Sequence, residues 1–250
     1  MKSLILAAGY ATRLYPLTLN TPKALLTIGG KAMLDWLVEE IATIPGMTEA
    51  HIVSNHRFIG QFEEWARGAA LRYPALKFAV WDDGTTSNED RRGAVGDIQF
   101  VIEQAGLDDD LLIAASDNFF TFKLRDFARD FERTGCDTLL TVRVDDVATL
   151  RKLAVATLSA DNRVVSLVEK PKNPPTGVGV YAIYLYRSDT LPLFKQYLDE
   201  GNSKDAPGYF PEWLCGRKDV RAYLCGGECI DVGSPEALAS VNERFGGGKT

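Results

Sequence analysis

A loop of mostly small residues follows the first apolar run of the chain, and two cations come after it. The run, Leu4 to Ala8, stops at Gly9, and Arg13 and Lys23 follow the loop. Small side chains let backbone N–H groups approach phosphate oxygens closely, and an Arg and a Lys offset the charge of a pyrophosphate. An ordinary strand-to-loop turn with surface cations has the same pattern, so the residues alone leave a nucleotide site and such a turn equally open. The residues assigned to it are Leu6, Ala7, Ala8, Gly9, Tyr10, Ala11, Thr12 and Arg13. The segment lacks the GK[ST] element of a P-loop.

Two aspartates stand at the ends of short apolar runs. Asp117 comes just after Leu111 to Ala115, and Asp231 follows Cys229 and Ile230. Aspartate at such places often only caps the next segment or stabilises a turn. The two carboxylates converge, however, if both lie at the carboxyl ends of strands in one open α/β sheet, which is where such sheets bind ligands.

A third group of polar residues follows another apolar run. Glu169 and Lys170 come directly after Val164 to Val168, and Pro171 restricts the chain that follows. Lysine in a proline-rich loop is usually a solvated cation, and Glu169 would then only pair with Lys170. The alternative is that Lys170 is a cation kept in a fixed position directly after the strand.

The segment from Asp82 to Gly93 lies between a strand pattern and a helix pattern. Its Thr, Ser and Asn side chains both donate and accept hydrogen bonds, which suits them to recognise the edge of a base. Among them, Asn88 is the residue that we assign to base recognition.

The elements that must position these groups alternate through the first half of the chain. Apolar runs of four to six residues predict buried strands, and apolar residues at helical spacing predict amphipathic helices. Strands are expected at 4–8, 51–54, 76–81, 111–115 and 138–144, and helices at 34–44, 58–70, 95–104 and 124–133. This alternation predicts an α/β fold: a Rossmann-like, mostly parallel mixed sheet with helices on both faces.

After about residue 150 the pattern changes. Strands are expected at 153–158, 164–168 and 180–186, with little room for a helix between the first two, and helices at 189–198 and 235–245. The second half should therefore add antiparallel strands to the same sheet. We expect one catalytic domain over residues 1–245 and a tail over 246–250.

Composition limits the classes of partner. Lys plus Arg total 28 against 34 Asp plus Glu, a net charge of −6, which argues against a nucleic-acid surface. No apolar stretch approaches the ~20 residues of a spanning helix, so we expect no membrane partner. Four cysteines without a CxxC pair fit a reduced, cytoplasmic protein, and the chain is compatible with a homo-oligomer.

Two other motifs in the sequence do not fit their usual context. Gly177 to Ala182 matches a loose G-x-G-x-x-A dinucleotide pattern, but Val180 to Tyr186 reads as a strand where a helix should open. The final Gly-Lys-Thr has no helix after it to complete a P-loop. A nicotinamide-dependent dehydrogenase is therefore a weak alternative.

Taken in order, the motifs resemble those of sugar-phosphate nucleotidyltransferases of the glucose-1-phosphate thymidylyltransferase and uridylyltransferase type. The resemblance rests on five segments spread over nearly the whole chain. They are Leu6 to Leu14 with Thr21-Pro22-Lys23, Gly93 to Gly96, Ala115 to Asn118, Val168 to Pro171, and Cys229 to Gly233. Tyr10 and Ala11 stand where the family pattern usually has glycine, and the Tyr10 side chain is expected to crowd the nucleotide.

The resemblance implies a role for each segment. Asp117 and Asp231 would hold Mg²⁺, a metal that binds one or two carboxylates plus phosphate oxygens. Lys170 would contact the acceptor phosphate, and Arg13 and Lys23 the NTP phosphates. The segment with Asn88 and Gly93 would cover the base. The residues placed at the acceptor are Asn118, Ala154, Glu169, Lys170 and Tyr181.

The predicted reaction joins an NTP and a sugar-1-phosphate to give an NDP-sugar and pyrophosphate. dTTP or UTP is the favoured donor, with CTP and GTP open. Ala154, Ala182 and Tyr181 suggest a pocket unlike the usual glucose site, so phosphocholine or a phosphonate with CTP is an alternative acceptor pair. The alternative from a different functional class is a nucleotide- or sugar-binding sensor without catalytic activity.

Overall fold

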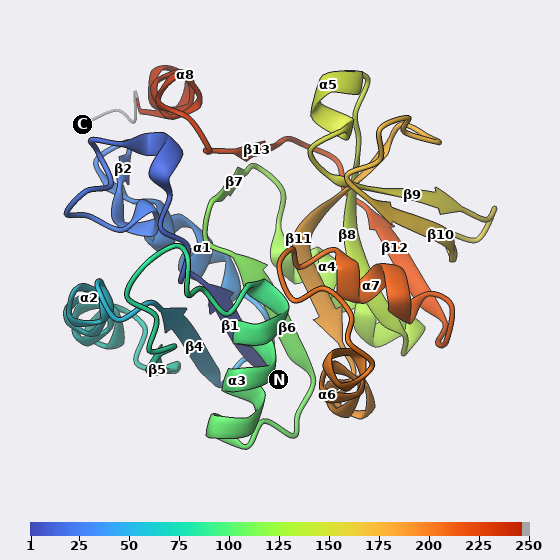
Figure 1. The fold of residues 1–250 in the computed structure, drawn as a ribbon, viewed down its shortest axis with the longest axis horizontal. Helices are drawn as coiled ribbons and strands as arrows, with labels where there is room; N and C mark the ends of the chain where they lie inside the picture. Colours follow the sequence, from blue (N-terminus) through green and yellow to red (C-terminus); the bar gives the residue numbers. More distant parts are fainter. Residues whose placement is uncertain (247–250) are drawn as a thin grey trace.

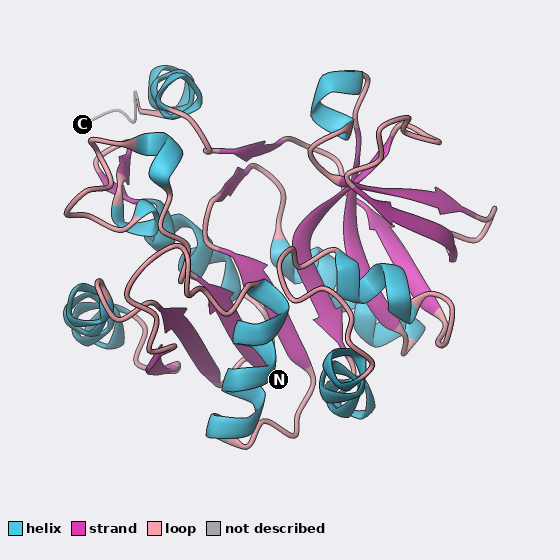
Figure 2. Ribbon diagram, viewed as in Figure 1, coloured by secondary structure: helices cyan, strands magenta, loops and turns pink. Residues whose placement is uncertain are grey.

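The computed structural model describes residues 1–246, and a nine-stranded mixed sheet forms its centre (Figure 1). Its main path runs in the order β10-β9-β11-β6-β1-β4-β5, with β8 and β12 attached through β11. The α/β fold class predicted from the alternation of elements is confirmed, including helices on both faces of the sheet (Figure 2). The predicted tail lies outside the described residues apart from Gly246.

The first half of the chain forms the parallel part of the sheet. β1 (Lys2–Leu6) lies between β4 (Glu49–Ser54) and β6 (Leu111–Ala115), and β5 (Lys77–Asp82) continues beyond β4. The helices of this half are α1 (Met33–Ile41), α2 (Ile59–Arg72), α3 (Ala94–Ala105) and α4 (Leu124–Thr134). β1 ends at Leu6, two residues before the predicted end, so Ala7 and Ala8 belong to the loop.

The second half adds the antiparallel strands that the change of pattern predicted. β11 (Val178–Tyr186) runs antiparallel to β6, β8 (Asp137–Arg143) and β9 (Ala154–Leu158), and β10 (Val164–Glu169) pairs with β9. β12 (Val220–Leu224) lies parallel to β8. The pattern at Gly177 to Ala182 therefore enters a strand, as expected, which removes the support for a dinucleotide fingerprint.

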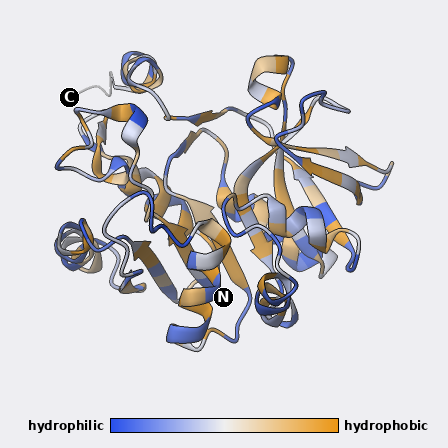
Figure 3. Cartoon of the chain, in the orientation of Figure 1, coloured by the Kyte–Doolittle hydropathy of each residue, from blue (hydrophilic) through white to orange (hydrophobic). Residues whose placement is uncertain are grey.

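Helices cover the sheet through two separate apolar layers. Successive residues of a strand, such as Leu4 and Ile5, point to opposite faces of the sheet and so belong to different layers. One layer packs against α1, α2 and α4, and the other against α3, α6 (Leu191–Asp199) and α7 (Tyr209–Leu214). The central strands are accordingly the most apolar part of the chain (Figure 3).

Short elements complete the fold beside the sheet. β7 (Asn118–Phe120) pairs with β13 (Cys229–Asp231), and β2 (Thr27–Ile28) pairs with β3 (Lys31–Ala32). α8 (Pro235–Phe245) packs on these pairs through Val241, and α5 (Val147–Leu150) precedes β9. Three 3₁₀ turns cover Thr12–Leu14, Lys23–Leu25 and Ser188–Thr190.

Several of these elements escaped the sequence analysis. β7, α7 and β12 carry no long periodic pattern, since α7 has six residues and β7 three. Within residues 1–246, no helix combines the length and the apolar character needed to cross a membrane.

Candidate active site

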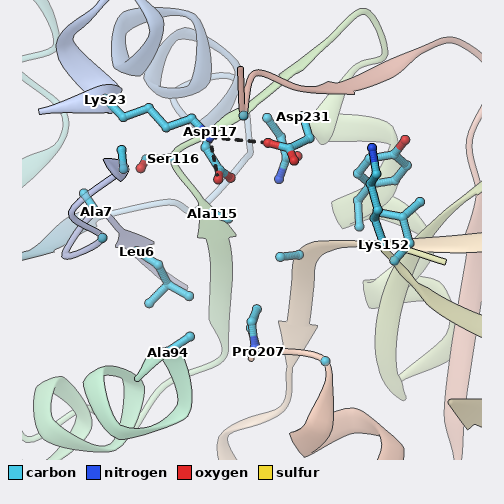
Figure 4. A pocket seen from close by; sticks show the side chains of 18 of the residues that line it. Leu6, Ala7, Lys23, Ala94, Ala115, Ser116, Asp117, Lys152, Pro207 and Asp231 are labelled. Atoms are coloured by element: carbon cyan, nitrogen blue, oxygen red, sulfur yellow. Dashed lines mark hydrogen bonds and ion pairs between the residues drawn. The ribbon is translucent and has the colours of Figure 1, made fainter. Parts of the chain in front are cut away.

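A pocket of about 470 Å³ opens at the carboxyl ends of β1 and β6 and extends along β11 to the start of β9. Residues from distant parts of the chain line it, among them Lys23, Asp117, Lys152, Pro207 and Asp231 (Figure 4). This is the edge at which open α/β sheets bind ligands.

The loop after β1 forms one wall of the pocket in an uncommon backbone conformation. Ala11 adopts φ 47° and ψ 42°, a left-handed conformation that few residues other than glycine take up. The hydroxyl of Thr18 donates to the Ala11 carbonyl at 2.8 Å and holds this turn. The buried Asn55 amide donates to the Ala8 carbonyl at 2.9 Å, which ties the loop to the end of β4. Arg13 lies at the pocket and is exposed.

Lys23 joins the two aspartates that the sequence places 114 positions apart. Its Nζ lies 2.9 Å from Oδ2 of Asp117 and 3.3 Å from Oδ1 of Asp231. The pairing of β7 with β13 brings the carboxylates together, and Val232 N donates to the Asp117 carbonyl at 3.0 Å. The Lys23 side chain is 11% exposed, and the two carboxylates are 40% and 46% exposed and open to the pocket.

These carboxylates fit a magnesium site. Within residues 1–246, no three His, Cys, Asp or Glu side chains gather as a group that could hold a metal ion. Mg²⁺ does not require such a group when substrate phosphates are present, because it takes one or two carboxylates and completes its shell with phosphate oxygens and waters. The ammonium group of Lys23 contacts both Asp117 and Asp231, so the two carboxylates share a single positive charge. The expected contact of Lys23 with the NTP phosphates stays a prediction.

The opposite end of the pocket is lined by residues of β9, β10 and β11. Lys170 Nζ lies 3.5 Å from Oε1 of Glu169, whose side chain is only 6% exposed. Burial raises the pKa of the Glu169 carboxyl, and the nearby Lys170 opposes this shift. Tyr181 also lines this end, and burial raises the pKa of its phenol. A buried carboxylate beside a cation can accept hydrogen bonds from ligand hydroxyls while the cation binds an anionic group.

The segment between β5 and α3 contributes less to the pocket than its composition suggested. Asn88 lines the pocket, but the backbone and hydroxyl groups of Thr86 and Ser87 donate to the Asp90 carboxylate and so stabilise the loop itself. Gly93 does not line it. Gly93 has φ +82°, and a Cβ there would lie 2.8 Å from the carbonyl carbon of Lys204, so glycine makes room for another backbone segment.

Of the residues assigned from the sequence, all but Ala8 and Gly93 line the pocket. The assigned residues that line the pocket are Leu6, Ala7, Gly9, Tyr10, Ala11, Thr12, Arg13, Lys23, Asn88, Asp117, Asn118, Ala154, Glu169, Lys170, Tyr181 and Asp231. The pocket is also lined by four residues that were not predicted from the sequence: Lys152, Tyr184, Pro207 and Gly208. Lys152 stands two residues before the assigned Ala154, which was a usable signal. Pro207 and Gly208 lie in no recognisable motif.

The chain is similar in sequence and in fold to known proteins. A sequence model of the family described as nucleotidyl transferase matches residues 2–246. The glucose-1-phosphate thymidylyltransferase of Streptomyces antibioticus is 28% identical over 186 residues, which are 74% of this chain and 49% of that protein. The glucose-1-phosphate adenylyltransferase of Fervidobacterium nodosum is 25% identical over 258 residues, covering 96% of this chain and 60% of that protein.

A solved structure of UDP-glucose pyrophosphorylase complexed with UDP-glucose superposes with a TM-score of 0.81 at 19% identity. The superposition covers 98% of this chain and 97% of that chain, and at this identity it shows a shared fold. The chain spans 49% and 60% of the length of the two curated relatives named above.

Proposed function

The chain belongs to the nucleotidyl transferase family, and we propose on that basis that it transfers a nucleotidyl group from an NTP to a sugar-1-phosphate and releases pyrophosphate. The observation that carries this proposal is the convergence of Lys23, Asp117 and Asp231 in the pocket, between the loop after β1 and the Glu169–Lys170 pair. Two anionic substrates can meet at that point only if cations offset their charge, and Lys23 together with a Mg²⁺ ion held by the two carboxylates would supply that charge.

The chain's own residues would hold the donor at the end formed by the loop after β1. Backbone N–H groups of Gly9 to Thr12 and the guanidinium of Arg13 would bind the NTP phosphates. Asp117 and Asp231 would hold Mg²⁺, which when bound neutralises phosphate charge. Lys23, whose Nζ contacts both carboxylates in the absence of substrate, would then donate to an NTP phosphate oxygen.

The acceptor would bind at the opposite end of the pocket. Lys170 would orient its phosphate so that one phosphate oxygen attacks the α-phosphorus of the NTP in line with the departing pyrophosphate. No covalent intermediate with the enzyme is needed, so positioning and electrostatic stabilisation supply the rate. The buried Glu169 carboxylate would accept hydrogen bonds from acceptor hydroxyls, and Asn118, Ala154 and Tyr181 would shape the site around them.

The donor base and the sugar are finer proposals. We favour dTTP or UTP, because Asn88 lines the pocket with an amide that can donate to and accept from a base edge, and a pyrimidine pocket would reject purines by size. CTP and GTP stay as alternatives, since the relatives named above differ in their bases. Ala154 and Tyr181 favour an acceptor other than glucose-1-phosphate. We also propose a cytoplasmic location, which suits the four free cysteines.

A matrix of substrates tests the proposal. Five NTPs are each combined with a dozen sugar-1-phosphates and with phosphocholine, with Mg²⁺, and pyrophosphate release is measured. The expected result is release that requires both a donor and an acceptor. Release with phosphocholine and CTP alone would select the alternative acceptor pair. Nucleotide binding without release for any pair would instead show a sensor.

A further inference from the structure

Gly208 lies against the carboxylate of Glu169. A Cβ at position 208 would overlap Oε2 of Glu169, would lie 2.9 Å from its Cδ, and would lie 3.3 Å from the Cβ of Ala154. Gly208 is buried, and its backbone does not have a positive φ, so conformation does not require glycine there. The requirement for glycine comes from the space that the Glu169 carboxylate occupies.

The segment that carries Gly208 is anchored on both sides. Before it, Val95 N and Ala94 N at the start of α3 donate to the carbonyls of Lys204 and Asp205, at 3.0 Å and 2.9 Å. After it, α7 begins at Tyr209 and buries Phe210, whose ring stacks on Phe194 at 3.6 Å between centroids. The backbone at position 208 therefore cannot retreat easily from a new side chain.

The backbone of Glu169 is also anchored, but the end of its side chain is less restrained. Its N–H donates to Oε2 of Glu212 on α7 at 3.0 Å, and its carboxylate lies 3.5 Å from Lys170 Nζ. Rotation about the side-chain bonds can move the carboxylate with little cost to the fold, because only a flexible side-chain end must shift. A methyl group at position 208 would displace the carboxylate and leave the protein folded.

We propose that Gly208 is a positioning residue for acceptor recognition: the absence of a side chain there lets the Glu169 carboxylate lie in the acceptor end of the pocket. The anchored segment Lys204–Gly208 also connects this carboxylate to the start of α3, where Ala94 lines the same pocket. The inference rests on the proposed transfer to a sugar-1-phosphate, in which Glu169 binds acceptor hydroxyls.

Steady-state kinetics of Gly208→Ala test the inference, with the NTP and sugar-1-phosphate pair that the wild type uses best. We expect the acceptor KM to rise at least about tenfold, which corresponds to one lost charge-assisted hydrogen bond. The NTP KM and the melting temperature should stay close to those of the wild type. Gly216→Ala is the matched control, because a Cβ there meets only the Trp213 carbonyl oxygen, at an ordinary 3.7 Å.

A double variant separates positioning from a general structural effect. In Glu169→Ala the carboxylate is absent, so adding Gly208→Ala should raise the acceptor KM no further. An active wild type with equal acceptor KM in Gly208→Ala and Gly216→Ala would overturn the inference and leave the proposed function standing. Additive effects in the double variant would overturn it as well. A wild type that transfers to no acceptor would overturn the proposed function, and this inference with it.

Discussion

The hydroxyl of Tyr10 lies 3.2 Å from Oγ1 of Thr85 and links the loop after β1 to the loop after β5. The Tyr10 side chain is buried at 5% exposure, so it forms part of the pocket wall. Thr85 is in turn fixed by its own N–H and hydroxyl, each of which donates to the Asp83 carboxylate at 2.7 Å. The residue that was expected to crowd the nucleotide therefore holds two pocket-lining loops together.

Loss of this bond should loosen nucleotide binding. We expect Tyr10→Phe to raise the NTP KM about fivefold with little change in kcat, because a hydrogen bond of this kind contributes about 1 kcal/mol. Thr85→Val should have a similar effect, and the double variant should be no worse than either. Kinetics of the three variants measure this, with Tyr223→Phe, outside the pocket, as control. Fully additive effects of Tyr10→Phe and Thr85→Val on the NTP KM would contradict a direct coupling between the two residues.

The two aspartates should matter for activity far more than for stability. Asp117→Asn and Asp231→Asn should each lower kcat at least about a hundredfold, because each removes a carboxylate proposed to hold Mg²⁺. The free energy of unfolding should change by no more than about 1 kcal/mol, since the carboxylates are 40% and 46% exposed. Pyrophosphate release and urea unfolding measure the two effects. Asp126→Asn, on the surface of α4, is the control; wild-type turnover in Asp117→Asn would refute the assignment.

The buried Asp97 should make stability depend on pH. Burial, and then the neighbouring Asp83, raise the pKa of Asp97 to about 8, against opposing effects of Arg92 and Lys204. Between the ordinary carboxyl value of 3.8 and about 8, the folded protein keeps a proton that the unfolded chain has released. Wild-type stability therefore falls as the pH rises through this window, by up to about 1.4 kcal/mol per pH unit.

Asp97→Asn removes this proton, while its amide can still donate a hydrogen bond towards Asp83. The stability of the variant relative to the wild type should therefore increase from pH 5 to pH 8 and level off above it. Urea unfolding at four pH values measures the difference. A difference that stays constant over this range would show that Asp97 is ionised in the folded protein.

Asn88 should influence which NTP is used. Its side chain belongs to the loop between β5 and α3 and lines the pocket. We expect Asn88→Ala to change the ratio of kcat/KM values among dTTP, UTP, CTP and GTP by about tenfold, as loss of a polar contact to a base does. Asn173→Ala, which alters an exposed residue outside the pocket, is the control. An unchanged NTP profile would place base recognition elsewhere.

The local features of this protein followed from its sequence. Apolar runs and helical spacing predicted most strands and long helices within a few residues, because a buried strand or an amphipathic helix needs its apolar residues at fixed local intervals. The small-residue loop after Leu6, the cations Arg13 and Lys23, and the aspartate after β6 could be named for the same reason: each is a pattern of neighbouring residues.

Relations between distant residues depended on the tertiary structure. Lys23 meets Asp117 and Asp231 across 94 and 208 positions because β7 pairs with β13, and no local pattern specifies that pairing. Gly93 and Gly208 are glycines because another segment occupies the space of their missing side chains, and only the packed fold determines which segment that is. Local spacing is encoded in neighbouring residues, whereas the packing that brings distant segments together exists only in the folded tertiary structure.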